Sequence, residues 1–293
     1  MTAGNLVQAI RDDREHGASE LARQCLDGLA DYARTIQVTD ALVLKAGLIG
    51  LARRLQQARP AMAPITNLLA NWLAAFERSS ADTPEDIRNA ATKAAEALIQ
   101  ESKEALSKAA ANAVNLIGTG KTIITHSLSS TVFAVFEALA PRVRAIVTES
   151  RPPGEGRRLA AKLSALGITV EFISDQQMGI FVQNADVALV GADTIASEGT
   201  VINKAGTYLL ALAARDRGIP FYVCFESFKC SKLAPAAIPL EHNDPAEFDP
   251  PELPHVEAHN VYFDVTPSKL VTAWITEARV FNERAALARL TSA

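Results

Sequence analysis

Residues 115–127 of this 293-residue chain read NLIGTGKTIITHS, and the sequence pattern changes within this stretch. Before it, apolar residues recur at the three- and four-residue spacing of amphipathic helices; after it, short apolar runs alternate with helical segments. Gly118 and Gly120 are typical of a helix end and a turn, and TIIT (122–125) is typical of a buried strand. The stretch therefore predicts where a helical domain gives way to an α/β domain.

The run GTGKT (118–122) resembles the end of a nucleotide-binding P-loop, but its context does not fit. A P-loop has a further glycine five residues before the second glycine, and Asn115 stands at that position. A P-loop also follows a strand and opens a helix, whereas here a helical pattern precedes the glycines and a strand follows them. We therefore predict a helix C-terminus and a turn, and expect the chemistry beyond the far end of the strand.

Composition narrows the class of protein. The chain is 48% hydrophobic and 21% charged, which suits one large or two smaller globular domains. A net charge of −4 without a basic block argues against a nucleic-acid groove or a membrane partner. The N-terminus has no apolar signal core, so we expect a cytoplasmic protein. Three scattered cysteines without zinc spacing predict reduced thiols, with no metal and no cofactor.

Residues 1–117 predict a helical domain. Apolar residues recur at helical spacing in 17–34, in 41–57 and from Pro84 to Leu116. Thr83 is expected to cap the last of these helices, with Pro84 at its first position.

Residues 118–293 predict a Rossmann-like, doubly wound and mainly parallel sheet. Strand and helix patterns alternate here at the rhythm of such folds. The expected strands are 122–125, 144–149, 169–174, 187–191, 220–225 and 261–265. The polar, proline-rich connection 231–258 is expected to be a lid, an oligomer contact or an unstructured excursion.

Polar and charged residues follow several of these strands. Ligands of open α/β sheets bind beyond the carboxyl ends of the strands, so these residues are expected to converge. Asn203 and Lys204 are expected at a helix N-terminus, where a lysine and neutral donors suit a phosphate. With cations to hold the phosphate, Asp193 is left for proton transfer, as in a sugar-phosphate site. The candidates are Ser127, Ser129, Ser130, Arg151, Asp193, Asn203, Lys204 and Lys229.

Each candidate also has a simpler interpretation. Asp193 could cap a turn, and Asn203 and Lys204 could be ordinary helix-start residues. The serines could be an N-cap cluster for the following helix. His126 beside a buried strand is more often a hydrogen-bonded structural histidine than a catalyst, and Cys224 fits packing.

Seven segments together resemble one superfamily of proteins. It comprises ribose-1,5-bisphosphate isomerase, methylthioribose-1-phosphate isomerase and the alpha, beta and delta regulatory subunits of translation initiation factor 2B. The segments are DREHGASELA (13–22), ARPAMAPITNLL (58–69), ITHSLSS (124–130), TESRPPGEGRRLAAKL (148–163), VALVGADTIASEGTVINKAGTYLLALAA (187–214), IPFYVCFESFK (219–229) and FDVTPSKLVTAWITE (263–277).

The resemblance implies a phosphorylated pentose or a nucleotide as ligand, and a homodimer or a higher homo-oligomer. In the isomerases an acid donates a proton toward the ring oxygen, and a cysteine thiolate removes the C2 proton of an aldose 1-phosphate. Asp193 matches the acid. The matches to the substrate-binding residues are Gly17, Ala18, Arg59, Asn203, Lys204 and Lys229.

Two departures from the isomerase pattern leave two functions open. Ser127 stands where the isomerases have cysteine, and His16 stands where they have arginine. A serine hydroxyl is a much poorer base than a thiolate. The chain is therefore expected to be either an aldose–ketose isomerase with altered base chemistry or a non-catalytic sugar-phosphate sensor like the factor 2B alpha subunit.

Overall fold

The computed structural model describes residues 2–283, and the chain divides into two compact units after Glu104. The predicted boundary at 117/118 coincides instead with the end of helix α5 (Pro84–Ile117), which continues from the first unit into the second. The assignment of 1–117 and 118–293 as domains stays a prediction.

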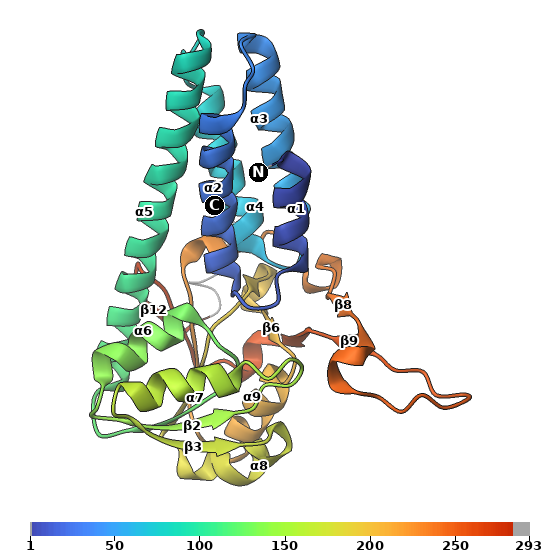
Figure 1. Ribbon diagram of the computed structural model, residues 1–293. Coiled ribbons are helices and arrows are strands. Elements are labelled where there is room, and N and C mark those ends of the chain that lie inside the picture. Colours follow the sequence, from blue (N-terminus) through green and yellow to red (C-terminus); the bar gives the residue numbers. More distant parts are fainter. Residues whose placement is uncertain (1, 284–293) are drawn as a thin grey trace. The chain divides into compact units, whose positions relative to one another are not determined.

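The first unit is helical, as the periodicity predicts. Side-chain caps start some of its helices: Asp40 Oδ1 accepts from Val43 N at 2.9 Å, and Thr83 Oγ1 accepts from Asp86 N at 3.2 Å. Its core includes the stacked rings of Trp72 and Phe76, 4.7 Å apart. The helices are α1 (Ala3–Asp12), α2 (Ala18–Thr35), α3 (Ala41–Gln56), α4 (Ala63–Glu77) and the first part of α5 (Figure 1).

The GTGKT stretch is a helix end and a turn, which confirms the rejection of a P-loop. Gly118 and Gly120 have φ values of 73° and 75°, and Gly118 N donates to Val114 O at 2.9 Å. The left-handed conformation suits glycine and terminates α5. Strand β1 (Thr122–Thr125) follows directly.

The second unit is built on a seven-stranded sheet of order β12-β11-β7-β4-β1-β2-β3. All neighbouring strands are parallel except the edge pair β11–β12. The order reverses direction at β1 and β4, which is the doubly wound arrangement. The strands besides β1 are β2 (Arg144–Thr148), β3 (Thr169–Ile173), β4 (Val187–Val190), β7 (Phe221–Cys224), β11 (Ala273–Ile275) and β12 (Val280–Phe281).

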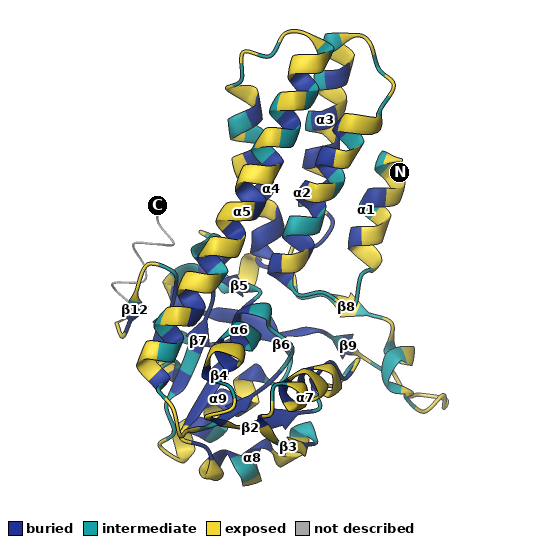
Figure 2. Ribbon diagram, turned by 60° about the vertical axis from the view of Figure 1, so that its left-hand side comes forward, coloured by how far each residue is buried: buried dark blue, intermediate teal, exposed yellow. Residues whose placement is uncertain are grey.

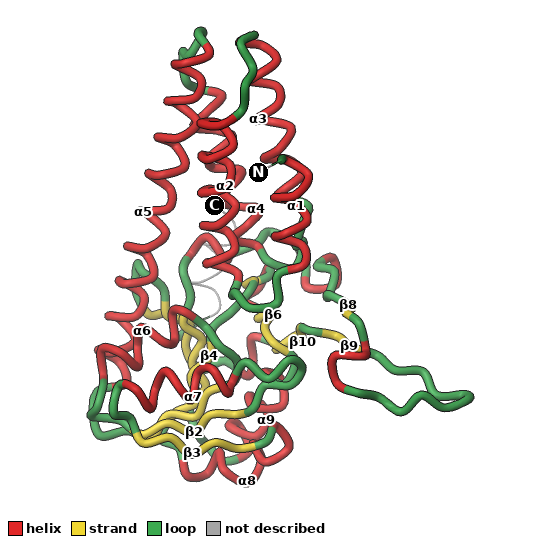
Figure 3. The backbone as a smooth tube through the Cα atoms, viewed as in Figure 1, coloured by secondary structure: helices red, strands yellow, loops and turns green. Residues whose placement is uncertain are grey.

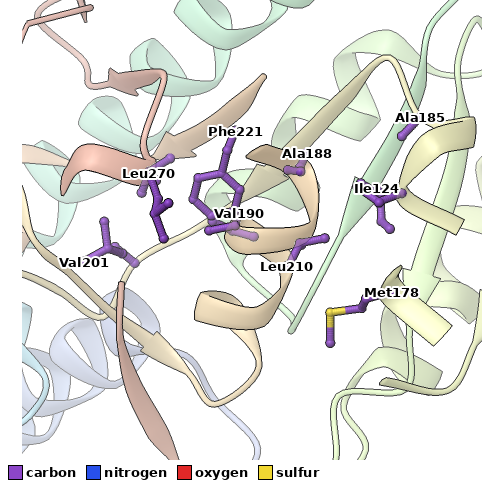
Figure 4. Packing of buried hydrophobic residues seen from close by; sticks show 14 of the residues in the cluster. Ile124, Met178, Ala185, Ala188, Val190, Val201, Leu210, Phe221 and Leu270 are labelled. Carbon is purple, nitrogen blue, oxygen red and sulfur yellow. The ribbon is translucent and has the colours of Figure 1, made fainter. Parts of the chain in front are cut away.

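A separate hydrophobic core packs on each face of this sheet. On one face the end of α5, α6 (Ser130–Leu139) and α7 (Gly156–Ala165) cover the strands. On the other face lie α8 (Met178–Phe181) and α9 (Thr207–Asp216). Figure 4 shows part of this second core, in which Leu210 of α9 belongs to one cluster with Val190 and Phe221. The central strands β1, β2, β4 and β7 are mostly buried between the two cores, whereas the edge strand β3 is largely not (Figure 2).

The structure corrects the prediction in three places. Residues 201–204 form strand β6 (Val201–Lys204), so Asn203 and Lys204 do not lie at a helix N-terminus; α9 begins three residues later. Strand β6 pairs with β5 (Thr194–Ile195) and β10 (Phe263–Thr266) in a small antiparallel sheet. The predicted strand 261–265 thus joins this sheet rather than the main one, and β11 was not predicted.

The connection 231–258 is mainly loop (Figure 3). It contains short 3₁₀ turns and β8 (His242–Asn243), which pairs with β9 (Asn260–Val261). Within residues 2–283, no helix is long and apolar enough to cross a bilayer.

Candidate functional site

Loops that carry predicted site residues meet at one edge of the main sheet. Strands β2, β1, β4 and β7 are parallel neighbours, so the segments that follow them leave the sheet at the same edge. Ser127 follows β1 and Asp193 follows β4, on the two sides of the point where strand order reverses. Open α/β sheets bind ligands at this point.

Ser127 is held in an unusual backbone conformation. Its φ is 72°, and its amide donates to Ser150 Oγ at 2.8 Å. Its hydroxyl donates to Glu155 Oε1 at 2.9 Å. Non-glycine residues at positive φ are uncommon, and they cluster at functional sites. The neighbouring loops therefore fix the Ser127 hydroxyl against a carboxylate.

Glu155 and Lys204 form a buried ion pair next to Ser127. Lys204 Nζ lies 3.2 Å from Glu155 Oε1, and the two residues expose only 6% and 9% of their surface. Lys204 Nζ also donates to Pro152 O at 3.2 Å and lies 4.2 Å from the centre of the Tyr262 ring. Glu155 Oε2 is buried and has no hydrogen-bond partner among the described residues.

His126 is a structural residue, which confirms the simpler interpretation. Its Nε2 lies 2.8 Å from Ala205 O, which can only accept, so this nitrogen carries the proton. Its Nδ1 lies 2.7 Å from Thr148 Oγ1. Burial lowers the pKa of His126, so the ring is neutral and both nitrogens are occupied.

The position of the His126 ring explains why residue 206, at the start of α9, is a glycine. Gly206 has a φ of 111°, and a Cβ there would lie 2.7 Å from His126 Nε2. Asp264 Oδ2 accepts from Gly206 N at 2.7 Å and from Tyr208 N at 3.0 Å, which caps the helix. Burial raises the pKa of Asp264 to about 6, against the two backbone hydrogen bonds.

The loop after β2 is fixed by one carboxylate. Asp175 accepts from Ser150 N at 2.7 Å and from Arg151 N at 2.8 Å. Asp175 therefore fixes the backbone of Ser150 and Arg151, whereas the Arg151 side chain is exposed. Ser129 is the N-cap of α6 and Ser130 its first residue, as the N-cap interpretation predicts.

Lys229 and Asn203 are both buried and both already have partners. Lys229 Nζ lies 3.1 Å from Glu226 Oε2, and Glu226 is fully buried. Asn203 Nδ2 donates to Thr207 Oγ1 at 2.9 Å. Asp193 N donates to Ile202 O at 3.0 Å, which brings Asp193 next to the strand that carries Asn203 and Lys204.

The first unit brings together the four site residues predicted in it. Gly17 is the N-cap of α2 and Ala18 its buried first residue. His16 Nδ1 lies 2.7 Å from Asp13 Oδ2, and Arg59, 4% exposed, donates to Asp13 O at 2.8 Å. Burial raises the pKa of Asp13, but hydrogen bonds from His16 and Glu15 outweigh that effect and hold this pKa below its usual value.

Sequence reasoning missed Glu155 and Tyr262 as parts of the site. Glu155 lies in the quoted segment 148–163, and a carboxylate at the start of α7 was a visible signal. Tyr262 comes after the long connection, so only the fold places its ring on Lys204. Among residues 2–283 no cluster of three or more His, Cys, Asp or Glu side chains is placed to hold a metal ion.

The model of the initiation factor 2 subunit family matches residues 14–283, nearly the whole of this chain. The chain belongs to that family. A Pyrococcus furiosus relative, the putative translation initiation factor eIF-2B subunit 2-like, is 34% identical over 93% of each chain. A Haloferax volcanii relative, ribose 1,5-bisphosphate isomerase, is 31% identical over 90% of this chain and 84% of its own.

The solved structures agree with this membership. The 5-methylthioribose 1-phosphate isomerase of Pyrococcus horikoshii superposes with a TM-score of 0.83 at 26% identity, over 99% of this chain and 88% of that one. The Pyrococcus horikoshii translation initiation factor eIF-2B superposes with a TM-score of 0.84 at 33% identity, over 97% of this chain and 98% of that one. An isomerase and an initiation factor therefore share this fold. The resemblance drawn from the quoted motifs and the predicted fold class are confirmed.

Proposed function

We infer that this chain binds a phosphorylated pentose at the carboxyl edge of β2-β1-β4-β7 and converts an aldose 1-phosphate, such as ribose 1,5-bisphosphate, to the ketose. The observation that carries this inference is the buried Lys204 ammonium beside the Ser127 hydroxyl, both in contact with Glu155. Relatives named as ribose 1,5-bisphosphate isomerases, at 31% identity, support the substrate class.

In this proposal the residues have separate roles. Lys204 and Lys229 bind phosphate from the second unit, and Arg151 adds an exposed cation at the same edge. Asp193 protonates the ring oxygen as the sugar ring opens. Ser129, Ser130 and Asn203 are the other substrate-binding residues proposed in the second unit. For Gly17, Ala18, His16 and Arg59 of the first unit, substrate binding stays a prediction from the family resemblance.

Both phosphate-binding lysines are paired with glutamates, which shapes how a ligand would bind. An ammonium has three donors, and Lys204 directs two of them at Glu155 Oε1 and Pro152 O. A phosphate that contacts Lys204 therefore shares the ammonium with Glu155 or takes its place. Binding is expected to weaken the Glu155–Lys204 contact.

Ser127 supports a second candidate function. A chain that keeps the binding residues but has serine in place of the isomerases' cysteine fits a non-catalytic sensor of sugar phosphates or nucleotides. The 34% identical relative with an initiation-factor name is compatible with that role. For either function we propose a cytoplasmic homodimer built mainly from the α/β half; a monomer in light scattering at micromolar concentration would contradict the dimer.

Calorimetric titration with ribose 1,5-bisphosphate tests the binding site. Lys204→Ala removes a charged donor, which is worth about 1.5–3 kcal/mol, so affinity should fall roughly 10- to 150-fold. Lys121→Ala is the matched control, because Lys121 is exposed and lies just before β1, at the opposite end of that strand. Unchanged affinity in the Lys204 variant would remove Lys204 from the site.

A further inference from the structure

An aldose–ketose isomerisation needs a group that takes the proton from C2, and most candidates in the second unit are unsuitable. His126 has both ring nitrogens engaged and is 1% exposed. Ser127 is a neutral hydroxyl that donates its proton to Glu155, and such a hydroxyl is a far weaker base than a carboxylate. Cys224 and Cys230 have pKa values raised by burial, so neither is a thiolate near neutral pH.

The other carboxylates near this edge are also engaged. Asp175 uses both oxygens to accept the amides of Ser150 and Arg151. Glu149 accepts two hydrogen bonds from the exposed Arg157, at 2.6 and 3.2 Å. Glu226 is fully buried against Lys229.

Glu155 differs from these groups in its contacts with Ser127 and Lys204. Buried carboxylate oxygens without a hydrogen-bond partner among the described residues also occur in Glu226, which pairs with Lys229 instead. Both of its contacts, from Ser127 Oγ and Lys204 Nζ, are made to Oε1, which leaves Oε2 without a hydrogen-bond partner. A buried oxygen of a carboxylate that accepts no hydrogen bond is costly, and a catalytic role is one explanation for such an atom. Glu155 is also tied to the phosphate-binding lysine of the proposed site.

The geometry points to Glu155 as the catalytic base of the isomerisation, a role that rests on the function proposed above. Ser127 is then a positioning residue, because its hydroxyl holds Oε1 and its left-handed backbone fixes that hydroxyl. Two carboxylic groups would divide the proton transfers, with Asp193 as the acid and Glu155 as the base.

Asp193 and Glu155 each end the reaction in the protonation state in which they began it. Asp193 gives a proton to the ring oxygen as the bond from C1 to that oxygen breaks. Glu155 takes the C2 proton, and the electrons of the C2–H bond form the C1–C2 double bond of an enol phosphate. The C2 hydroxyl then returns its proton to Asp193 as the C2 carbonyl forms, and Glu155, whose proton has exchanged with solvent, delivers a solvent-derived proton to C1. No oxidant, reductant or metal enters the sequence.

Lys204 links substrate binding to this base. A phosphate that takes the Lys204 ammonium removes a cation from Glu155 and places an anion nearby. Both changes favour the protonated form of a carboxylate. The substrate would thus make its own base a better proton acceptor.

Exchange of the C2 proton of ribose 1,5-bisphosphate in heavy water, followed by proton NMR, tests this role. Glu155→Gln keeps the shape and an oxygen that can accept from Ser127, but it cannot take a proton. We expect exchange and turnover to fall by about 10²- to 10⁴-fold with binding retained in calorimetry. Glu171→Gln, which alters an exposed carboxylate paired with Arg144, is the matched control and should leave the rate unchanged.

Two further variants separate the alternatives. Glu155→Asp should recover part of the exchange lost in Glu155→Gln, which a merely structural effect on folding would not explain. Ser127→Ala should lower turnover less than Glu155→Gln does. Exchange within tenfold of the unsubstituted protein in Glu155→Gln, or complete loss in Ser127→Ala alone, would overturn Glu155 as the base. Binding without any exchange in the unsubstituted protein would overturn both this role and the proposed isomerase.

Discussion

Gly156→Ala is expected to destabilise the second unit strongly. Gly156 is the first residue of α7 and directly follows Glu155. A Cβ at Gly156 would lie 1.8 Å from Thr148 O and 2.9 Å from Glu149 O. Both neighbours are backbone atoms at the end of β2, so no side-chain rotation can relieve the clash.

The expected cost follows from the size of this overlap. Overpacking in well-packed regions typically costs about 1–3 kcal/mol, and a backbone clash lies at or above the top of that range. We expect a loss of about 3 kcal/mol, which corresponds to a fall in melting temperature of roughly 6–12 °C for a unit of this size. The shift would also move Glu155 away from Ser127 and Lys204, so ligand affinity should fall as well.

Urea unfolding followed by tryptophan fluorescence measures the effect. The chain has one tryptophan in each unit, Trp72 and Trp274, so a Trp72→Phe background makes Trp274 the reporter for the second unit. Gly47→Ala is the control, because Gly47 lies in α3 of the first unit with no atom within 4 Å of an added Cβ, and it should leave the Trp274 transition unchanged. A change below about 0.5 kcal/mol for Gly156→Ala would refute the close approach of α7 to β2.

Three further predictions concern stability and reactivity. Burial raises the pKa of Asp264 to about 6, so the folded state binds a proton more tightly than the unfolded state does. The stabilisation from this proton is complete below about pH 4 and is lost as the pH rises through 6, a fall of about 2–3 kcal/mol in the free energy of unfolding. In urea unfolding, Asp264→Asn should remove this dependence on pH. Burial raises the pKa of Cys25 and Cys230 to about 12, and that of Cys224 as well, so a thiol reagent near pH 8 should label the native chain far more slowly than the urea-unfolded chain; fast native labelling would contradict the burial. Thr83→Ala should cost the helical unit about 1 kcal/mol of unfolding free energy, and no change would disprove the cap.

Local signals made much of the fold predictable. The period of the apolar residues, the capping residue Thr83 and the paired glycines 118 and 120 act within a few residues of sequence. Helices α2, α3 and α5 and five of the main-sheet strands follow from such signals, whereas α1, α4 and α8 were not predicted. Strand β6 was misread because its sequence, VINK, leads into the start of α9, and only pairing with β5 and β10 makes it a strand.

The candidate site was predictable only where residues follow strands. The rule for open sheets brought Ser127 and Asp193 to one edge without any knowledge of side-chain contacts. The partners of Lys204 come from α7 and from the segment after the long connection, and no local pattern joins them to β6. The pairing of Lys204 and Lys229 with glutamates is likewise a property of the fold.

Phosphorus NMR of the protein with ribose 1,5-bisphosphate in heavy water tests the central claim most directly. The proposed function predicts that ribulose 1,5-bisphosphate signals appear and carry deuterium at C1. Shifted or broadened substrate signals without product would show a binding protein that does not turn its ligand over. Substrate signals unchanged in position, width and amount would contradict the sugar-phosphate site itself.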